Sequence, residues 1–202
     1  MIRQSRNAFI FSVVFLLTAC SILPSADPVT VYRLPVAETS ADSSGRVTGM
    51  SGRSLTVFTP YTNQFLDDGR IAVIPSGNRL SVYQGVRWND SAALVFRDRL
   101  IHDFRKKSSL KAVGSERDNL LADLVLRGDL DAFQVEYHQE QPVVIIKFDA
   151  TLMNGQNGTV MASRYFEASE PVAGTQVPEV VEAFGRAVTR LNNDIVYWAL
   201  QR

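Results

Sequence analysis

Three side chains in the second half of the chain are of types that bind metal ions. Glu136, His138 and Glu140 alternate along a predicted strand, and alternation places all three on one face. Carboxylate oxygens and imidazole nitrogens are common zinc ligands. However, the neighbouring glutamines and Pro142 mark this stretch as the exposed end of a hairpin, where a polar face is simply solvated. We therefore predict no metal site and no cofactor.

Other residues that could support catalysis occur in unpromising contexts. Ser51 lies among small residues predicted to form a loop and is not part of a G-x-S-x-G motif. Asp67 and Asp68 could act as paired acids, but Asp-Gly before a strand is typical of a turn. The sequence contains no phosphate-binding loop and no dinucleotide fingerprint. We predict no catalytic residues and no enzyme activity.

The single cysteine, Cys20, ends a segment with the features of a secretory signal. Arg3 and Arg6 precede an apolar run of about ten residues, whereas a helix that crosses a bilayer needs roughly twenty. Residues 17–20 read Leu-Thr-Ala-Cys, which resembles the lipobox of bacterial lipoproteins. The resemblance implies cleavage before Cys20 and acylation of that cysteine. The alternative, a plain secretory signal, would leave an isolated free thiol.

This interpretation divides the chain into three parts. Residues 1–19 are the signal peptide, residues 20–28 are the lipidated cysteine and a tether, and residues 29–202 are a single domain. The tether, Ser21 to Pro28, reaches at most about 28 Å when extended, so we expect the domain to stay close to the membrane. In lipoproteins, a serine such as Ser21 after the cysteine, in place of aspartate, implies the periplasmic face of a Gram-negative outer membrane.

The composition of the predicted mature chain excludes some partners. The full chain has 21 basic and 21 acidic residues, and loss of Arg3 and Arg6 leaves a net charge of about −2. A nucleic-acid-binding domain typically carries a basic surplus, so we predict no nucleic-acid partner. With Cys20 acylated, the domain can form no internal disulfide and depends on burial and hydrogen bonds.

Apolar periodicity predicts an α/β (α+β) fold: a mixed, mostly antiparallel sheet of about seven strands with two amphipathic helices packed on it. Residues 71–74 and 80–83 form a predicted hairpin. Three later strands, Ala122–His138, Val143–Met153 and Thr159–Glu167, follow one another as an antiparallel meander, with a bulge or bend expected at Gly128. The pattern leaves open whether the helices share one face of the sheet.

The two helices have recognisable starts. Asn89 or Asp90 is placed to cap the first helix, whose apolar stripe repeats every four residues from Phe96 to Phe104. Pro178 opens the second helix, which continues to the C-terminus. Charged residues fill the predicted polar face of the first helix: Arg97, Asp98, Arg99, Asp103 and Arg105.

The most distinctive local sequence is Arg87-Trp88-Asn89-Asp90, before the first helix. In one interpretation Trp88 fills the junction between strand and helix, and Arg87 pairs with a nearby acid. In the other, Tyr32, Arg87 and Trp88 form part of a partner surface, because aromatic residues and arginine often anchor interfaces. The two interpretations can both hold in part.

From Val29 onward, the order of several motifs resembles the family of ABC-type transport auxiliary lipoproteins, which includes the paraquat-inducible protein C type. Asn89 departs from the small residue expected after the tryptophan. The motifs that carry the resemblance are Val31-Tyr32-Arg33-Leu34, Arg87-Trp88-Asn89-Asp90-Ser91, Gly128-Asp129-Leu130 and Ser163-Arg164-Tyr165-Phe166.

The resemblance implies a docking or assembly subunit of an intermembrane lipid transport system. In such systems an ABC permease and ATPase work with an MCE-domain protein. The expected partners are these subunits and, through lipidated Cys20, the outer membrane; a homo-oligomer is left open. Two alternatives stay open: a periplasmic lipid carrier or chaperone, and a lipoprotein regulator of an envelope enzyme.

Overall fold

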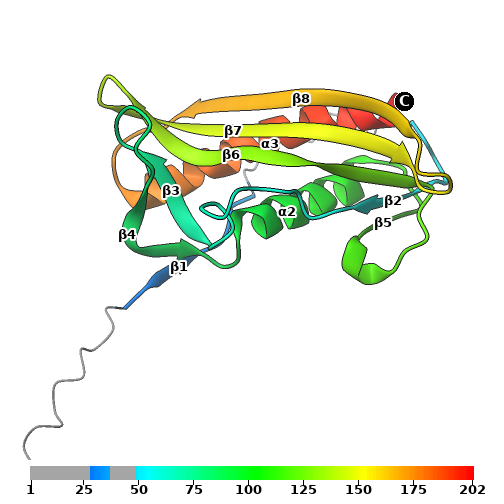
Figure 1. The fold of residues 1–202 in the computed structure, drawn as a ribbon, viewed down its shortest axis with the longest axis horizontal. Coiled ribbons are helices and arrows are strands. Elements are labelled where there is room, and N and C mark those ends of the chain that lie inside the picture. The colour runs from blue at the N-terminus through cyan, green and yellow to red at the C-terminus, as the bar shows by residue number, and fades with distance from the viewer. Residues whose placement is uncertain (1–27, 37–48) are drawn as a thin grey trace, which may run out of the picture.

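The computed structural model describes residues 28–36 and 49–202. An eight-stranded sheet lies in front of two helices, α2 (Ala92–Lys107) and α3 (Val177–Leu200), in the view of Figure 1. Both helices therefore cover the same face, and the predicted α/β class is confirmed. The predicted signal peptide, Cys20, most of the predicted tether and residues 37–48 lie outside the described residues. No helix in the described ranges is long and apolar enough to cross a membrane.

The longest strands form the predicted meander. β6 (Leu124–His138) pairs antiparallel along its whole length with β7 (Gln141–Asn154), and β7 pairs antiparallel with β8 (Val160–Pro171). The register shifts between Leu130 and Ala132, not at Gly128 as predicted. Gly128 serves close packing instead, because a Cβ there would lie 2.6 Å from the Phe148 ring and 2.1 Å from the Asp149 carbonyl oxygen.

The other edge of β6 is shared by two groups of short strands. β2 (Ser54–Val57) pairs in parallel with the start of β6, and β3 (Arg70–Ile74) pairs in parallel with its end. Between them, Tyr61 forms an isolated parallel bridge with Asp129. The chain therefore runs beside β6 from β2 to Tyr61, separates from it, and returns to it as β3. On this side the sheet consists of two separate lobes (Figure 1).

We call β1, β3 and β4 the proximal lobe, because it contains the first described residues. β4 (Ser81–Trp88) is antiparallel to β3, which confirms the predicted hairpin, and β1 (Thr30–Tyr32) pairs in parallel with the end of β4. We call β2, β5 (Ala112–Ser115) and the short 3₁₀ helix η1 (Glu116–Asp118) the distal lobe. β5 pairs in parallel with β2. The lobes lie at opposite ends of β6, which at 15 residues spans about 50 Å.

Helix α2 differs from its prediction in two ways. Ser91 is the N-cap and accepts a hydrogen bond from the Leu94 N–H at 3.5 Å, whereas Asp90 accepts one from the Ser91 N–H. The prediction of Asn89 or Asp90 as cap is therefore wrong. The predicted polar face is also largely buried: Arg97, Arg99 and Asp103 are 4%, 7% and 2% exposed. α3 covers α2 on one side, and residues from β2 to η1 cover it on another.

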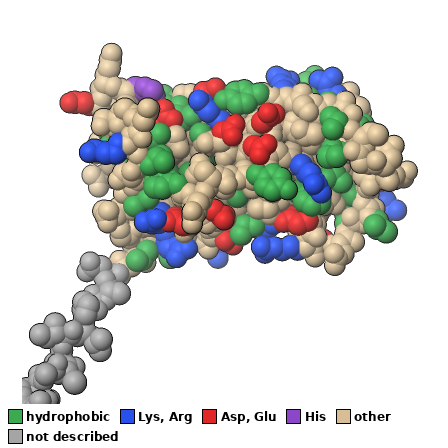
Figure 2. Space-filling model, viewed as in Figure 1, with side chains coloured by type: hydrophobic (Ala, Val, Ile, Leu, Met, Phe, Trp, Pro, Cys, Tyr) green, Lys and Arg blue, Asp and Glu red, His purple; other side chains and the backbone are tan. Residues whose placement is uncertain are grey.

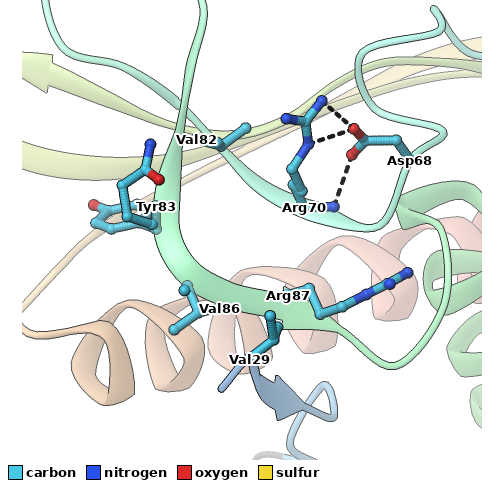
Figure 3. A pocket seen from close by; sticks show the side chains of 9 residues that line it. Val29, Asp68, Arg70, Val82, Tyr83, Val86 and Arg87 are labelled. Carbon is cyan, nitrogen blue, oxygen red and sulfur yellow. Dashed lines mark hydrogen bonds and ion pairs between the residues drawn. The ribbon is translucent and has the colours of Figure 1, made fainter. Parts of the chain in front are cut away.

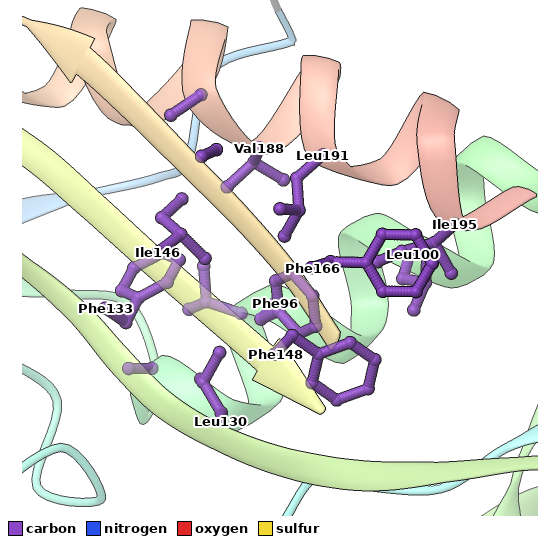
Figure 4. Close-up of a cluster of buried hydrophobic side chains, with 14 of the residues drawn as sticks. Phe96, Leu100, Leu130, Phe133, Ile146, Phe148, Phe166, Val188, Leu191 and Ile195 are labelled. Atoms are coloured by element: carbon purple, nitrogen blue, oxygen red, sulfur yellow. The ribbon is translucent and has the colours of Figure 1, made fainter. Parts of the chain in front are cut away.

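The core fills the space between the sheet and the helices (Figure 4). Pro178 lies in the first turn of α3, as predicted, and the apolar stripe of this helix faces the sheet. Phe96 packs on Phe148 with ring centroids 5.0 Å apart, and Phe166 packs edge-on against Trp198 at 5.5 Å. These contacts join both helices to the long strands. Every buried side chain of this kind contributes roughly 1.5–3 kcal/mol of transfer free energy.

The outer face of the meander is polar and carries mixed charges. Figure 2 shows acidic side chains gathered over its middle, among hydrophobic ones. Asp129 lies directly opposite Asp149 on β7, and Asp149 lies opposite Tyr165 on β8. Burial, followed by the charge of Glu167, raises the pKa of Tyr165. Among the described residues no group of three or more His, Cys, Asp or Glu side chains could hold a metal ion.

Candidate functional site

The N-terminal segment enters the domain at the proximal lobe. β1 adds three residues to the edge of β4, with Tyr32 paired to Trp88. The Asn89 N–H continues this pairing and donates to the Tyr32 carbonyl oxygen at 2.9 Å. Any anchor upstream of residue 28 is therefore joined to the fold at this edge.

A shallow groove of about 350 Å³ lies beside β1. Its apolar lining comes from Val29, Val82 and Val86, and Figure 3 shows Val29 and Val86 next to each other. The remaining lining includes Tyr83 and three charged residues. Burial, followed by the contact with Tyr137, raises the pKa of Tyr83, so its hydroxyl stays neutral. The charged residues of the groove are Asp68, Arg70 and Arg87.

Two of these charges neutralise each other. The Arg70 side chain donates hydrogen bonds to Asp68 Oδ2, and the Arg70 backbone N–H donates to Asp68 Oδ1 at 2.9 Å (Figure 3). The side-chain bond from Arg70 is the main reason why the pKa of Asp68 is lowered, and the charge of Arg87 adds to it. The Asp67-Asp68-Gly69 run therefore belongs to a turn, as its composition predicted, and not to a pair of catalytic acids. The ion pair of Asp68 with Arg70 was not predicted.

Arg87 is exposed and lies against this turn. Its Nε donates to the Trp88 carbonyl oxygen at 3.3 Å, and a Cβ at Gly69 would lie 2.9 Å from its Nη2. No carboxylate in the described part of the chain lies within ion-pair distance of Arg87. The place of Arg87 on a partner surface stays a prediction. Of its predicted pairing with an acid, the structure shows only that the charge of Arg87 helps to lower the pKa of Asp68.

Trp88 is not available to a partner. Its side chain is 0% exposed and packs edge-on against Phe133 at 5.9 Å and Phe184 at 5.2 Å. Its Nε1 has no hydrogen-bond partner among the described residues. Trp88 therefore fills the junction between β4 and α2, and the prediction that it lies on a partner surface is wrong. Tyr32 is half-buried and packs against the core.

Pro35 fixes the N-terminal segment to both helices. Arg99 Nη1 on α2 donates to the Pro35 carbonyl oxygen at 2.8 Å. On α3, Gly185 makes room for the ring, because a Cβ there would lie 2.7 Å from Pro35 Cγ. The segment that leads toward the predicted anchor is thus held by a buried charge and by a close backbone approach.

Arg99 belongs to a polar network between the helices. Its Nε donates to Asp103 Oδ2 at 3.1 Å, and its Nη2 donates to Thr189 Oγ1 at 2.8 Å. Asn192 Nδ2 donates to the same Asp103 oxygen at 2.8 Å. The Asn192 Oδ1 atom has no partner among the residues described. Each of the three guanidinium nitrogens of Arg99 donates one hydrogen bond, and the Asp103 carboxylate offsets its charge, so the arginine can be buried in this way.

Sequence reasoning missed this network. Two signals could have found it: Arg99 and Asp103 are oppositely charged and one helical turn apart, and Thr189 and Asn192 interrupt the apolar stripe of α3 at a spacing of three. Polar residues on predicted apolar faces often mark a contact between helices. Without the crossing of α2 and α3, however, the partner of each could not be named.

The metal and nucleophile candidates do not assemble. His138 Nε2 lies 3.8 Å from Glu136, but both belong to the exposed end of the β6–β7 hairpin. Glu140 lies in the turn with a φ of 65°, so it does not continue the alternation of β6. Ser51 is exposed in a turn before β2.

Comparison with known proteins identifies the family of the chain. The sequence profile of the ABC-type transport auxiliary lipoprotein component matches residues 32–196, which is most of the chain. The chain belongs to this family. Membership makes it a component auxiliary to ABC-type transport and a protein of the lipoprotein class, which is associated with membranes of the cell envelope. The family description names no enzyme activity.

Solved structures agree with the family fold. A Xanthomonas campestris protein is 28% identical with a TM-score of 0.74, over 85% of this chain and 95% of that protein. An uncharacterised protein is 14% identical with a TM-score of 0.67, over 84% and 97% of the two chains. A hypothetical protein of Chlamydia trachomatis is 9% identical with a TM-score of 0.50, over 73% and 95%. No curated protein matches the chain.

Proposed function

We propose that the chain is an outer-membrane lipoprotein that docks an MCE-type ABC transport complex to that membrane. The observation that carries the proposal is the family match over residues 32–196, in a chain whose single cysteine ends a signal-like segment. In this proposal residues 1–19 are removed, Cys20 is acylated, residues 20–28 are the tether, and residues 29–202 work in the periplasm. The partners are the MCE-domain protein and the permease and ATPase of the same system.

The proximal lobe supports an anchored role. β1, the Asn89–Tyr32 bond and the Arg99–Pro35 bond join the start of the domain to β4 and to both helices. A tether is useful to a docking protein only where its attachment is firm. The groove beside Val29 and the exposed Arg87 lie at the same place, so the proposed partner surface of Tyr32 and Arg87 would face the membrane side.

The anchor and the partners are tested separately. Cys20→Ala removes the acylation site, and the variant is expected to leave the outer-membrane fraction and to incorporate no labelled fatty acid. Ser21→Asp is the matched control for sorting and should move an acylated chain to the inner membrane. A Cys20→Ala protein that still fractionates with the outer membrane contradicts the anchor. Purification of the wild-type chain should recover the MCE protein, permease and ATPase, and repeated failure contradicts the docking role.

The alternative of a lipid carrier receives less support. Such a carrier needs an apolar cavity between the sheet and the helices, and in the described residues that space is filled by the core (Figure 4). Three of the nine residues that line the groove beside β1 are charged, and the groove is open to solvent.

A further inference from the structure

Three strands of the described sheet, β1, β5 and β8, pair with a neighbour on one side only. β1 and β5 are short, with three and four residues, whereas β8 has 12 and forms the upper edge of the sheet in Figure 1. The backbone N–H and C=O groups at a free edge can pair with a further strand, and proteins limit this by keeping edge strands short or covered. β8 is therefore the edge on which a further strand would form the longest ladder.

The middle of this edge is open, while both of its ends are blocked. At the start of β8 the register with β7 shifts and leaves Met161 without a partner. Near its end, Nη2 of Arg190 on α3 donates to the Ser169 carbonyl oxygen at 2.8 Å. Between these points the sequence has no lysine and no proline, the residues that commonly protect an edge. We call residues 162–168 the open edge.

Two hydrogen bonds show which backbone groups of β8 point outward. The Val172 N–H donates to the carbonyl oxygen of Pro142 on β7 at 3.0 Å, and the register is regular from there to Ala162. Residues that face β7 alternate with residues that face away, and Ser169 faces away because its carbonyl accepts from α3. The residues of the open edge whose N–H and C=O point outward are therefore Ser163, Tyr165 and Glu167.

The side chains of the open edge alternate between the two faces of the sheet. On the outer face Tyr165 is 49% exposed, and its hydroxyl donates to Oε2 of Glu167 at 3.3 Å. On the inner face Phe166 and Ala168 are each 4% exposed. A strand that fits beside β8 needs the same alternation, with its apolar side toward the helices. β8 of a second copy has this alternation.

The blocked ends select one register for such a pair. In an antiparallel pair with two-fold symmetry, the residue on the axis lies opposite itself. An axis at Phe166 or any later residue brings Ser169 into the ladder, where its carbonyl oxygen is already occupied. An axis at Arg164 or any earlier residue brings in Met161, which is out of register, and at Arg164 it also places two arginines directly opposite, which is destabilising. The open edge pairs completely with itself when the axis passes through Tyr165.

This register also matches the side chains. Tyr165 lies opposite Tyr165 of the partner subunit, and Ser163 lies opposite Glu167 of the partner subunit. Both pairs join residues whose backbone groups point outward, so each pair exchanges two N–H···O bonds. Arg164, whose guanidinium lies 5.0 Å from the Phe166 ring centroid within its own chain, lies opposite Phe166 of the partner subunit. No charged residue of the open edge then faces a like charge.

We infer that two copies of the chain pair through the open edge of β8, antiparallel and about a two-fold axis at Tyr165. The pair joins two eight-stranded sheets into one continuous sheet and places the helices of both copies on the same face. The self-complementary alternation, charges and length of the open edge argue for a second copy as the occupant. The pairing does not require the proposed function, because it depends only on β8.

Cysteine cross-linking of the full-length chain in its membrane tests the register. Tyr165→Cys places two Cα atoms about 5.5 Å apart, within disulfide reach, and oxidation should give at least about 10-fold more covalent dimer than in Ser163→Cys. Ser163→Cys is the matched control on the same face, because the two copies of residue 163 lie at least about 13 Å apart. Ser163→Cys combined with Glu167→Cys should cross-link again. Wild type, whose single cysteine is Cys20, gives the background.

A second measurement follows the mass of the detergent-solubilised full-length chain by light scattering. Tyr165→Lys places two ammonium groups opposite each other on the axis and should raise the Kd of the dimer at least about 10-fold. The matched control is Tyr61→Lys, because Tyr61 is 69% exposed and lies beside β6, away from β8. This variant should dimerise like wild type.

Three outcomes overturn the pairing. Tyr165→Cys may not exceed the wild-type background, or Ser163→Cys alone may cross-link equally well; either result contradicts the axis at Tyr165. If Tyr165→Cys cross-links to a different protein while the wild-type chain is monomeric, the open edge binds a strand of that protein instead. A chain that pairs as described but never recovers the MCE protein supports the pairing and contradicts only the proposed function.

Discussion

The proximal and distal lobes are each fixed by one buried arginine of α2, and the two arginines differ in their surroundings. Arg99 reaches the proximal segment at Pro35 and is enclosed by Asp103 and α3. Arg97, two residues earlier and thus on nearly the opposite side of the helix, reaches the distal lobe at Glu116. One helix therefore positions both ends of the molecule.

The two arginines differ in how exposed their carboxylate partners are. The Asp103 side chain is 3% exposed, whereas the Glu116 side chain is 27% exposed. Arg97 also contacts Asp98, whose side chain is 65% exposed. Burial on its own raises the pKa of Glu116, but the hydrogen bond from Thr59 and the charge of Arg97 together lower it. The proximal end is therefore fixed by a buried ion pair of Arg99 with one carboxylate. The distal end is fixed by a partly solvated interaction of Arg97 with two carboxylates.

The largest expected effect follows from removing the dry carboxylate. Asp103→Ala leaves Arg99 buried without its counter-ion and should lower the free energy of unfolding by about 3–5 kcal/mol. Glu116→Ala should cost only about 1 kcal/mol, because Arg97 keeps its hydrogen bonds to the solvent-exposed Asp98 carboxylate and to the Thr59 hydroxyl. Denaturant unfolding measures both values. Equal losses in the two variants would show that the contrast between the lobes is wrong.

A second pair of changes acts on close backbone contacts. Gly185→Ala places a Cβ 2.7 Å from Pro35 Cγ, and Gly155→Ala places one 2.0 Å from the Ala122 carbonyl oxygen. Each should destabilise the protein by about 1–3 kcal/mol, since a methyl group is forced into filled space. Hydrogen exchange should separate them. The Asn89 amide, which bonds to Tyr32, should exchange faster only in Gly185→Ala, and a faster Asn89 in both variants would count against independent lobes.

The smallest effect concerns acid stability of the distal lobe. Hydrogen bonds from the Ser54 N–H and hydroxyl lower the pKa of Asp123. A carboxyl with a lowered pKa in the folded state stabilises the protein at neutral pH, and this contribution is lost as the pH falls through that lowered value. Asp123→Ala should thus be less stable at pH 7 and lose less stability below about pH 4. The exposed control, Asp194→Ala, should follow the wild-type profile, and an unchanged Asp123→Ala profile would refute the assignment.

Apolar periodicity predicted those parts of the fold in which the local sequence pattern matches the burial of the side chains. The meander of β6, β7 and β8, the β3–β4 hairpin and both helices follow from alternation, turn residues and apolar stripes. The parallel pairings of β1, β2 and β3 could not be predicted, because parallel partners are distant in sequence and leave no turn between them. The pairing of β1 with β4 shows this, since residues 30–32 meet residues 86–88.

The candidate site was predicted less well than the fold. The exposed position of Arg87 agrees with its place on a surface, but Trp88 is buried, because an aromatic residue at a strand end can serve either role. Arg99 and Asp103 were assigned to a polar face because helical periodicity does not show that a second helix covers it.

The short ladder of β1 has a mechanical consequence. A pull on the N-terminal segment loads three paired residues and the Asn89–Tyr32 bond before it reaches Pro35. Behind Pro35 stand the buried Arg99 and the close fit at Gly185. Tension between a membrane and a bound partner would therefore peel β1 from the edge of β4 first, and the sheet and helices would keep their shape while the tether grows longer by the length of the released strand.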